Sequence, residues 1–347
     1  MQSLFEPIIA PHPEFFQRAL ARQAQLTKPP GSLGMLETLA ARLAAMQSRD
    51  QPRLDTIHVS IFAADHGIAA EGVSAFPQSV TAQMVKNFAA GGGAVNVLAR
   101  HVKAQFEVVD VGLSEPVDLP GVINNHAGFG TANFKHQKAI NESEFYVSLA
   151  AGRAAVNRAL AGQADLFIGG EMGIANTTSA SAIAAALLSV PASQVTGAGT
   201  GLTDQQIIHK TDVIEQALQH HHKHLQDPVA ILLALGGFEI VALVAAYVRA
   251  AQKGLPVLVD GFISSVAALA AVKINPGCAD WFFYGHLSDE KGHKIVLDAL
   301  TAEPILQLHL RLGEASGAVM AVPILQMACQ LHNEMATFTQ ANITTGQ

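Results

Sequence analysis

A single carboxylate lies within a small and apolar stretch near the carboxyl end of the chain. Glu314 is the only acidic residue between His309 and Pro323, and its neighbours are glycine, alanine, serine, leucine and valine. A carboxylate in such surroundings loses hydration, which raises its pKa toward the range that suits a general base. The same residue could instead cap the helix that follows. The stretch therefore offers a candidate base whose role depends on its partners elsewhere.

Two glycine-containing loops precede predicted helices and could bind an anion. The first, Gly169–Thr178, follows a short apolar strand, and Thr177 or Thr178 could cap the helix after it. The second, Thr196–Gly201, precedes a helix that carries Lys210. The N–H groups at a helix start attract phosphate, and a lysine beside such a loop is a candidate ligand. The glycine spacing of the first loop differs from the dinucleotide-binding fingerprint.

Strands and helices are expected to alternate along the chain. Short apolar runs predict buried strands, and Ala-rich or amphipathic segments follow them. These runs are Ile57–Ala64, Phe106–Val111, Leu166–Ile168, Pro256–Val259 and Trp281–Tyr284. The alternation predicts an α/β fold with a mostly parallel sheet and helices on both faces. Because the carboxyl ends of parallel strands meet at one edge, we expect Asp65, Glu171, Asp260 and Ser288 to be neighbours there.

Composition excludes several classes of function. Of the 347 residues, 50% are apolar and 14% charged, with a net charge of −7 and no basic run, so nucleic acid is not an expected partner. Cys278 and Cys329 fit no metal spacing, and we expect both to be buried thiols in a reducing cytoplasm. The first ten residues lack the pattern of a secretory signal.

One apolar window requires a membrane check. Pro228–Val248 is nearly all apolar, but Gly236, Gly237 and Glu239 interrupt it halfway. A membrane span needs about 20 apolar residues without such a break. We therefore expect two buried segments joined at the glycine pair, and no membrane partner.

Five segments together resemble one enzyme family over almost the whole chain. They are Lys28–Gly34, Ala64–Gly67, Gly170–Thr178, Val259–Phe262 and Arg311–Gly317. The sequence is similar in these segments to the nicotinate-nucleotide–dimethylbenzimidazole phosphoribosyltransferase (CobT) family, which assembles the nucleotide loop of cobalamin. The resemblance implies phosphoribosyl transfer from nicotinate mononucleotide to 5,6-dimethylbenzimidazole, with inversion at the anomeric carbon and with no metal or other cofactor.

The resemblance also implies an architecture. We expect a Rossmann-like large domain over residues 60–300 that holds the phosphate and ribose site. A smaller helical domain, built from residues 1–59 and 301–347, is expected to supply the general base. A homodimer is expected as well.

Functional roles can be carried over residue by residue from the matching motifs. Glu314 falls on the family's general base, which removes the benzimidazole N–H proton, and Glu171 falls on a second glutamate close to the ribose. The implied phosphate and ribose contacts are Gly173, Asn176, Thr177, Gly199, Lys210, Asp260 and Ser288. The implied pocket for the aromatic base comprises Phe76, Gln83, Met84 and Leu312. Some family members have a small polar residue in place of Phe76, so another aromatic base, such as a purine or a phenol, remains an alternative.

Two other functions compete with this interpretation. The same loops could belong to a nucleotide-binding module without catalysis. Alternatively, a metal-dependent hydrolase could be built on Asp65, His66, Asp260 and His286.

Overall fold

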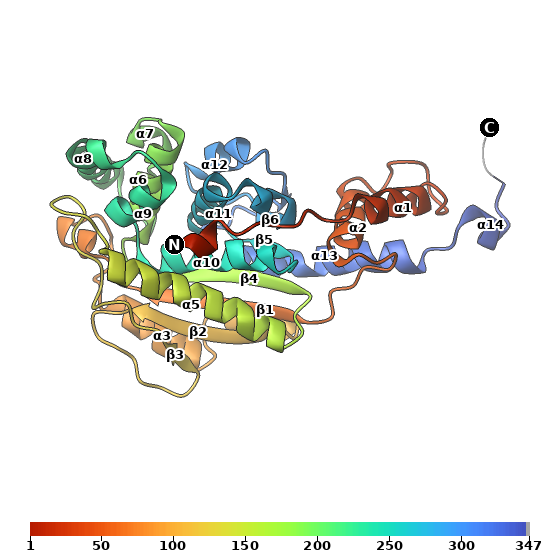
Figure 1. The fold of residues 1–347 in the computed structure, drawn as a ribbon, viewed down its shortest axis with the longest axis horizontal. Helices are drawn as coiled ribbons and strands as arrows, with labels where there is room; N and C mark the ends of the chain where they lie inside the picture. The colour runs from red at the N-terminus through yellow and green to blue at the C-terminus, as the bar shows by residue number, and fades with distance from the viewer. Residues whose placement is uncertain (345–347) are drawn as a thin grey trace.

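Seven parallel strands form the central sheet of the chain, which a computed structural model describes over residues 1–344. The spatial order is β3-β2-β1-β4-β5-β6-β7, and every neighbouring pair is parallel (Figure 1). The strands are β1 (Ile57–Ala64), β2 (Gln105–Gly112), β3 (Val122–Asn124), β4 (Leu166–Met172), β5 (Val257–Val259), β6 (Phe282–His286) and β7 (Pro304–Leu306). The predicted α/β fold is confirmed.

The two edge strands were not predicted from the sequence. β3 and β7 have three residues each, and none of these residues is fully buried. The central strands β1 and β4 are buried along their whole length and are therefore rich in apolar residues. An edge strand needs no such run, because one side of it faces solvent.

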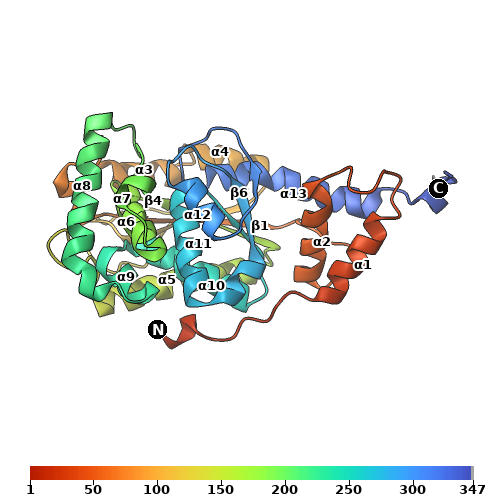
Figure 2. The same cartoon turned by 90° about the horizontal axis from the view of Figure 1, so that it is seen from above.

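Helices cover both faces of the sheet, as Figure 2 shows. On one face lie α3 (Val80–Ala89), α4 (Ala94–His101) and the start of α13 (Ser316–Glu334). On the other lie α5 (Glu142–Ala161), α10 (Phe238–Gln252) and α11 (Phe262–Ile274). The other α-helices that surround the sheet are α6 (Asn176–Leu188), α7 (Ala192–Val195), α8 (Asp204–His221), α9 (Pro228–Leu235) and α12 (His293–Ala299).

The apolar window of the sequence forms two helices. α9 ends at Leu235 and α10 begins at Phe238, so the glycine pair separates them as predicted. α10 packs along α5, where Gly152 allows close contact, since an added Cβ there would lie 2.0 Å from the carbonyl oxygen of Ala242. Within residues 1–344, no helix combines the length and the apolar character that crossing a membrane requires.

Segments near both ends of the chain meet in a small helical unit at one end of the molecule, whereas the first residues lie against α10 (Figure 1). It contains α1 (Pro13–Gln23), α2 (Met35–Gln47), the end of α13 and α14 (Phe338–Ala341). The Arg22 guanidinium donates to the carbonyl oxygens of His332 and Asn333. β7 and the start of α13 lie instead against β6, so the segment after residue 300 contributes to the sheet as well as to this unit.

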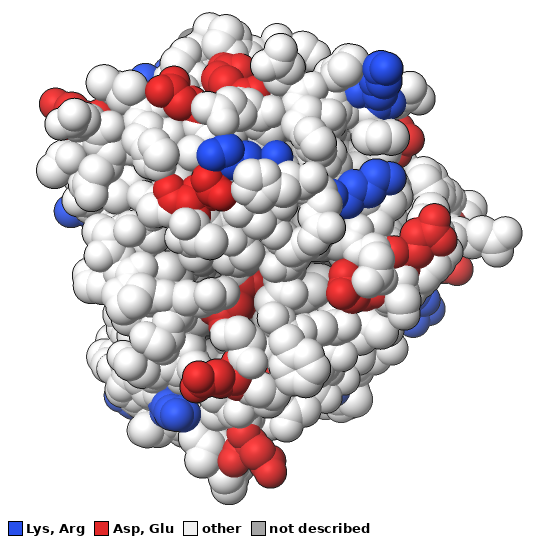
Figure 3. Space-filling model, turned by 90° about the vertical axis from the view of Figure 1, so that its left-hand side faces the viewer, with Lys and Arg blue, Asp and Glu red and all other residues white. Residues whose placement is uncertain are grey.

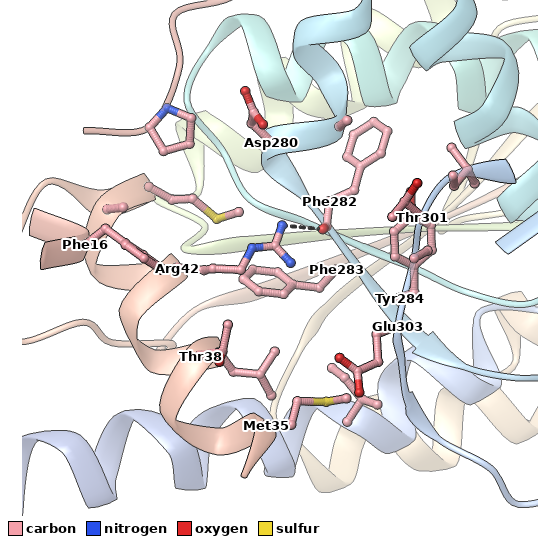
Figure 4. A pocket seen from close by; sticks show the side chains of 18 of the residues that line it. Phe16, Met35, Thr38, Arg42, Asp280, Phe282, Phe283, Tyr284, Thr301 and Glu303 are labelled. Atoms are coloured by element: carbon pink, nitrogen blue, oxygen red, sulfur yellow. Dashed lines mark hydrogen bonds between the residues drawn. The ribbon is translucent and has the colours of Figure 1, made fainter. Parts of the chain in front are cut away.

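A cavity of about 640 Å³ lies between this helical unit and the beginning of β6 (Figure 4). The guanidinium of Arg42 from α2 covers the Phe283 ring, with its Cζ 4.4 Å from the ring centroid. The same group donates a hydrogen bond of 2.8 Å to the carbonyl oxygen of Phe282. Phe16 and Met35 supply apolar walls from the helical side. Arg42 thus fastens the helical unit to the sheet at the amino end of β6.

Candidate active site

A second cavity, of about 440 Å³, lies at the carboxyl edge of the sheet. The ends of β4, β5 and β6 form its floor, and the loop before α13 and the start of α3 form its walls. Figure 3 views the molecule from this end and shows an acidic side chain in a hollow near the middle of the face, with acidic and basic side chains scattered around it. Open parallel sheets bind ligands at this edge. This cavity is therefore the candidate site.

Most of the residues that the sequence analysis selected line this cavity. They are Phe76, Met84, Glu171, Gly173, Asn176, Thr177, Gly199, Asp260, Ser288, Leu312 and Glu314. Gln83 and Lys210 are not among its lining residues. The fold thus gathers residues that are up to 238 positions apart in the sequence, between Phe76 and Glu314.

Glu314 lies in a loop with a left-handed backbone. The φ angles of Gly313, Glu314 and Ala315 are 82°, 60° and 62°. Such values are unfavourable for residues with a side chain and persist where the surrounding structure enforces them. The loop rests directly on β4 at Gly170, where an added Cβ would lie 2.7 Å from the Cβ of Ala315. Ala315 is the N-cap of α13, and the Glu314 carboxylate accepts no hydrogen bond from the first turn among the described residues, so the alternative role of Glu314 as a cap is wrong.

Burial raises the pKa of Glu314 to about 7, and the negative charge of Asp260 adds to this effect. A carboxylate with such a pKa is partly ionised at neutral pH and accepts a proton readily. Asp260 itself accepts a hydrogen bond of 2.7 Å from the Ala318 N–H in the first turn of α13. Asp260 therefore fixes the helix that carries the Glu314 loop and also tunes Glu314 electrostatically.

Glu171 lies beside this loop at the end of β4. Burial raises its pKa to about 8, with further contributions from the charges of Glu239 and Asp260. Its carboxylate accepts hydrogen bonds from the Asn176 side-chain amide and, at 3.5 Å, from the Glu314 N–H. These two donors fix the orientation of the carboxylate. Two carboxyl groups with raised pKa values thus share one cavity.

The two glycine loops meet around Lys210. The Lys210 Nζ donates a hydrogen bond of 2.8 Å to the Thr177 hydroxyl, and the side chain is completely buried. This burial lowers the pKa of Lys210 to about 8. An added Cβ at Gly199 would lie 2.7 Å from the Thr177 Oγ1 and 3.2 Å from the Lys210 Nζ. Lys210 therefore lies behind the wall formed by Thr177 and Gly199, and it reaches the cavity through the Thr177 hydroxyl.

The start of α6 differs from the expectation. We expected Thr177 or Thr178 to cap the helix, but α6 begins at Asn176 and its N-cap is Ala175, with φ 75°. The Thr177 hydroxyl accepts a hydrogen bond from Lys210, and the buried Thr178 hydroxyl has no partner among the described residues. Asn176, the first residue of α6, donates its side-chain amide to the Glu171 carboxylate.

The apolar wall is formed by Phe76, Met84 and Leu312. Phe76 and Leu312 are 52% and 58% exposed, so a flat ligand would cover apolar surface that now faces solvent. Gln83 is exposed on α3 and lies outside the cavity lining. Consecutive residues on a helix point in directions about 100° apart, and on α3 this places Met84 at the cavity and Gln83 toward solvent.

Asp65 and His66 do not line this cavity, although Asp65 was expected beside Glu171 and Asp260. The Asp65 carboxylate instead accepts 2.9 Å and 2.7 Å hydrogen bonds from the N–H and hydroxyl of Ser114. The His66 Nε2 lies 2.5 Å from the Glu239 carboxylate, and both side chains are fully buried. Within residues 1–344, no group of three or more His, Cys, Asp or Glu side chains could hold a metal ion.

Comparison with known proteins agrees with this geometry. A family model described as Phosphoribosyltransferase matches residues 8–343. The nicotinate-nucleotide–dimethylbenzimidazole phosphoribosyltransferase of Pseudomonas syringae pv. syringae (strain B728a) is 55% identical over 327 residues, which cover 94% of this chain and 93% of the relative. The enzyme of that name from Azotobacter vinelandii (strain DJ / ATCC BAA-1303) is also 55% identical over the same shares. The chain belongs to this family.

Solved structures of the CobT family show the same fold. The crystal structure of CobT from Thermus thermophilus has a TM-score of 0.92 and 44% identity, and the match covers 96% of this chain and 100% of that chain. The family match includes the whole cavity, from Phe76 to Glu314. The chain is therefore a phosphoribosyltransferase whose cavity lies at the carboxyl edge of a CobT-type sheet.

Several cavity residues were not selected from the sequence as part of a substrate site, and His286 is one of them. His286 is the last residue of β6 and lines the cavity, but the sequence analysis weighed it only as a metal ligand. A lone histidine after a short apolar run carries no signal of its own. Only the position of β6 between β5 and β7 brings it to the site.

Proposed function

We propose that this cavity transfers the phosphoribosyl group of nicotinate mononucleotide to 5,6-dimethylbenzimidazole, with Glu314 as the general base. The bond between C1′ and the nicotinate nitrogen breaks, and its electron pair leaves with nicotinate. A benzimidazole nitrogen forms the new bond to C1′, and the proton of the other nitrogen passes to Glu314. The products are α-ribazole 5′-phosphate and nicotinate.

The observation that carries this proposal is the position of Glu314 in a mostly apolar cavity. Its pKa of about 7 suits proton removal, and Leu312, Phe76 and Met84 offer apolar surface to a flat ring. General-base catalysis of this kind is worth about 10²- to 10⁴-fold in rate. Holding both substrates in place can contribute about 7–11 kcal/mol more.

Glu171 is proposed to stabilise the positive charge that develops on the ribose as nicotinate leaves. Before substrate binds, its pKa of about 8 keeps it mostly protonated at neutral pH. The nicotinate ring of the bound mononucleotide is a pyridinium cation, and a cation beside a carboxyl group favours its ionised form. The substrate therefore draws Glu171 into the charged state that the reaction needs.

The phosphate is proposed to bind at the two glycine loops, against Gly173, Gly199 and Ser288. All three line the cavity, and Thr177 connects the loops to the Lys210 ammonium behind them. A phosphate there gains N–H donors and a nearby cation. Asn176 and Asp260 then lie on the ribose side, next to Glu171.

The test combines the purified protein with nicotinate mononucleotide and dimethylbenzimidazole and looks for α-ribazole phosphate by mass spectrometry. We expect Glu314→Ala to lower kcat by about 10²- to 10⁴-fold. Glu303→Ala is the matched control, because Glu303 is an exposed carboxylate of the other cavity. Unchanged turnover in Glu314→Ala would remove the assigned base, and mononucleotide binding without nicotinate release would support the non-catalytic alternative.

We also infer that the protein acts as a homodimer and that α1, α2, the end of α13 and α14 form its small domain, whereas residues 345–347 of the expected domain lie outside the described residues. Met320 and Met327 support a dimer, since both are exposed and lie seven residues, or two turns, apart on α13. The two side chains therefore share one apolar stripe on the surface. A second copy of the chain would cover it.

A further inference from the structure

His286 is a buried histidine without a hydrogen-bond partner. Its side chain is 2% exposed, and neither ring nitrogen has a partner among the described residues. Buried polar groups in folded proteins are nearly always paired, and an unpaired one costs about 1–3 kcal/mol. Because His286 also lines the candidate active site, a bound ligand can provide the missing partner.

The neighbouring side chains cannot supply that partner. The nearest charged group is the Asp260 carboxylate, whose Oδ1 lies 3.7 Å from the His286 Nε2 and already accepts from the Ala318 N–H. This distance is too long for a hydrogen bond. The ring of His293 lies edge-on with its centroid 6.0 Å away, and its own nitrogens contact the Ser288 and Ser265 hydroxyls.

Two glycines surround the His286 ring. An added Cβ at Gly317 would lie 2.0 Å from the ring, so α13 packs directly on the imidazole. At Gly261, which lines the cavity, an added Cβ would lie 3.2 Å from Nε2. No side chain at Gly261 therefore stands between the Nε2 edge and the cavity, although Nε2 itself is buried.

The surrounding charges select the kind of ligand group. The Asp260 carboxylate lies 3.7 Å from the ring, and Glu171, Glu314 and Arg311 line the same cavity, so a phosphate placed directly on His286 would face the Asp260 carboxylate. An apolar ring would leave the imidazole unpaired. A hydroxyl group fits, because it can donate to the Asp260 carboxylate and accept from the imidazole N–H.

We propose that His286, together with Asp260, binds a hydroxyl group of the ribose and so positions the sugar for transfer. The juxtaposition of the unpaired His286 ring, the Asp260 carboxylate and the open backbone at Gly261 supports this assignment. The inference rests on the proposed function, since it names the sugar of the phosphoribosyl donor as the ligand. It adds a specificity-determining residue to that function.

The experiment measures the Kd of nicotinate mononucleotide and of its 2′-deoxy and 3′-deoxy analogues by calorimetry, for the wild type and for His286→Ala. We expect His286→Ala to weaken binding of the parent mononucleotide by about 10- to 100-fold, the range for one hydrogen bond that includes a partly charged partner. For the analogue that lacks the contacted hydroxyl, the variant should change Kd by less than about twofold. Equal weakening for all three ligands, or no weakening, overturns the assignment.

Two further variants separate binding from structure. His286→Asn keeps a donor and an acceptor near the same place and should recover part of the affinity for the parent mononucleotide. His309→Ala is the matched control, because His309 is exposed, bonds the Asp289 carboxylate and lies outside the cavity lining. An effect of His309→Ala on Kd equal to that of His286→Ala would also overturn the assignment.

The wild-type assay distinguishes the two proposals. If the wild type forms no α-ribazole phosphate, the proposed function fails. If the wild type is active and the selective loss in His286→Ala is absent, only the role of His286 fails.

Discussion

At the scale of single residues, the charge of Glu314 should govern the pH dependence of the reaction. A general base works in its ionised form, and the pKa of Glu314 is raised to about 7. We therefore expect kcat to rise with pH and to level off above about 7. Below that pH, kcat should fall about tenfold for each unit, because the ionised fraction falls in that proportion.

The measurement is a pH–rate profile between about pH 5 and 9 at saturating substrate. Asp260→Asn removes a negative charge that raises the pKa of Glu314, so the rising limb should move to lower pH in that variant. A wild-type profile that stays flat across the acidic half of this range would argue against a titrating base at this position.

At the scale of elements, the first turn of α13 depends on the absence of a side chain at Gly317. Glycine to alanine usually stabilises a helix by roughly 0.5–1 kcal/mol. Here the new Cβ would collide with the His286 ring, 2.0 Å away. Overpacking of this kind costs about 1–3 kcal/mol, so we expect Gly317→Ala to lower the free energy of unfolding.

The double variant Gly317→Ala, His286→Ala provides the control for this expectation. Removing the ring makes room for the new methyl group, so adding Gly317→Ala to His286→Ala should no longer destabilise the protein. Urea unfolding followed by circular dichroism compares the four proteins. If Gly317→Ala destabilises both backgrounds equally, the contact with His286 is not the cause.

The elements also show what the sequence could and could not predict. Buried strands such as β1 and β4 were predictable because continuous apolar runs form them, and the polar residues after β4, β5 and β6 do gather at one edge. The left-handed N-caps Ala175 and Ala315 were not predictable. Alanine has no local preference for positive φ, and the packing of the loop on Gly170 enforces it at Ala315.

The candidate site likewise combines residues that the sequence indicates with positions that only tertiary packing sets. Glu171, Asp260 and Glu314 could be selected because each is an isolated carboxylate in a glycine-rich or apolar motif. The sequence did not indicate that Lys210 would lie behind Thr177, nor that Gln83 would face away from its neighbour Met84. Both depend on the rotation of a helix about its axis, and that rotation is set by tertiary packing.

At the scale of the whole molecule, the exposed methionine stripe on α13 is expected to hold two copies of the chain together. Burying apolar surface is worth about 25 cal/mol per Å², so a charge in the middle of such an interface is costly. We expect the wild type to have twice the 36.4 kDa mass of one chain in light scattering. Met327→Glu should shift the protein toward the mass of a single chain.

Val147→Glu is the matched control for this test, because Val147 is an exposed apolar residue of α5, on the opposite face of the sheet (Figure 2). It introduces the same charge and should leave the mass unchanged. A wild type that remains a single chain at micromolar concentration would contradict the inferred dimer. The apolar stripe on α13 would then lie open to solvent. The proposed reaction would be unaffected by that outcome, because the carboxylates, glycine loops and His286 of the cavity come from one chain.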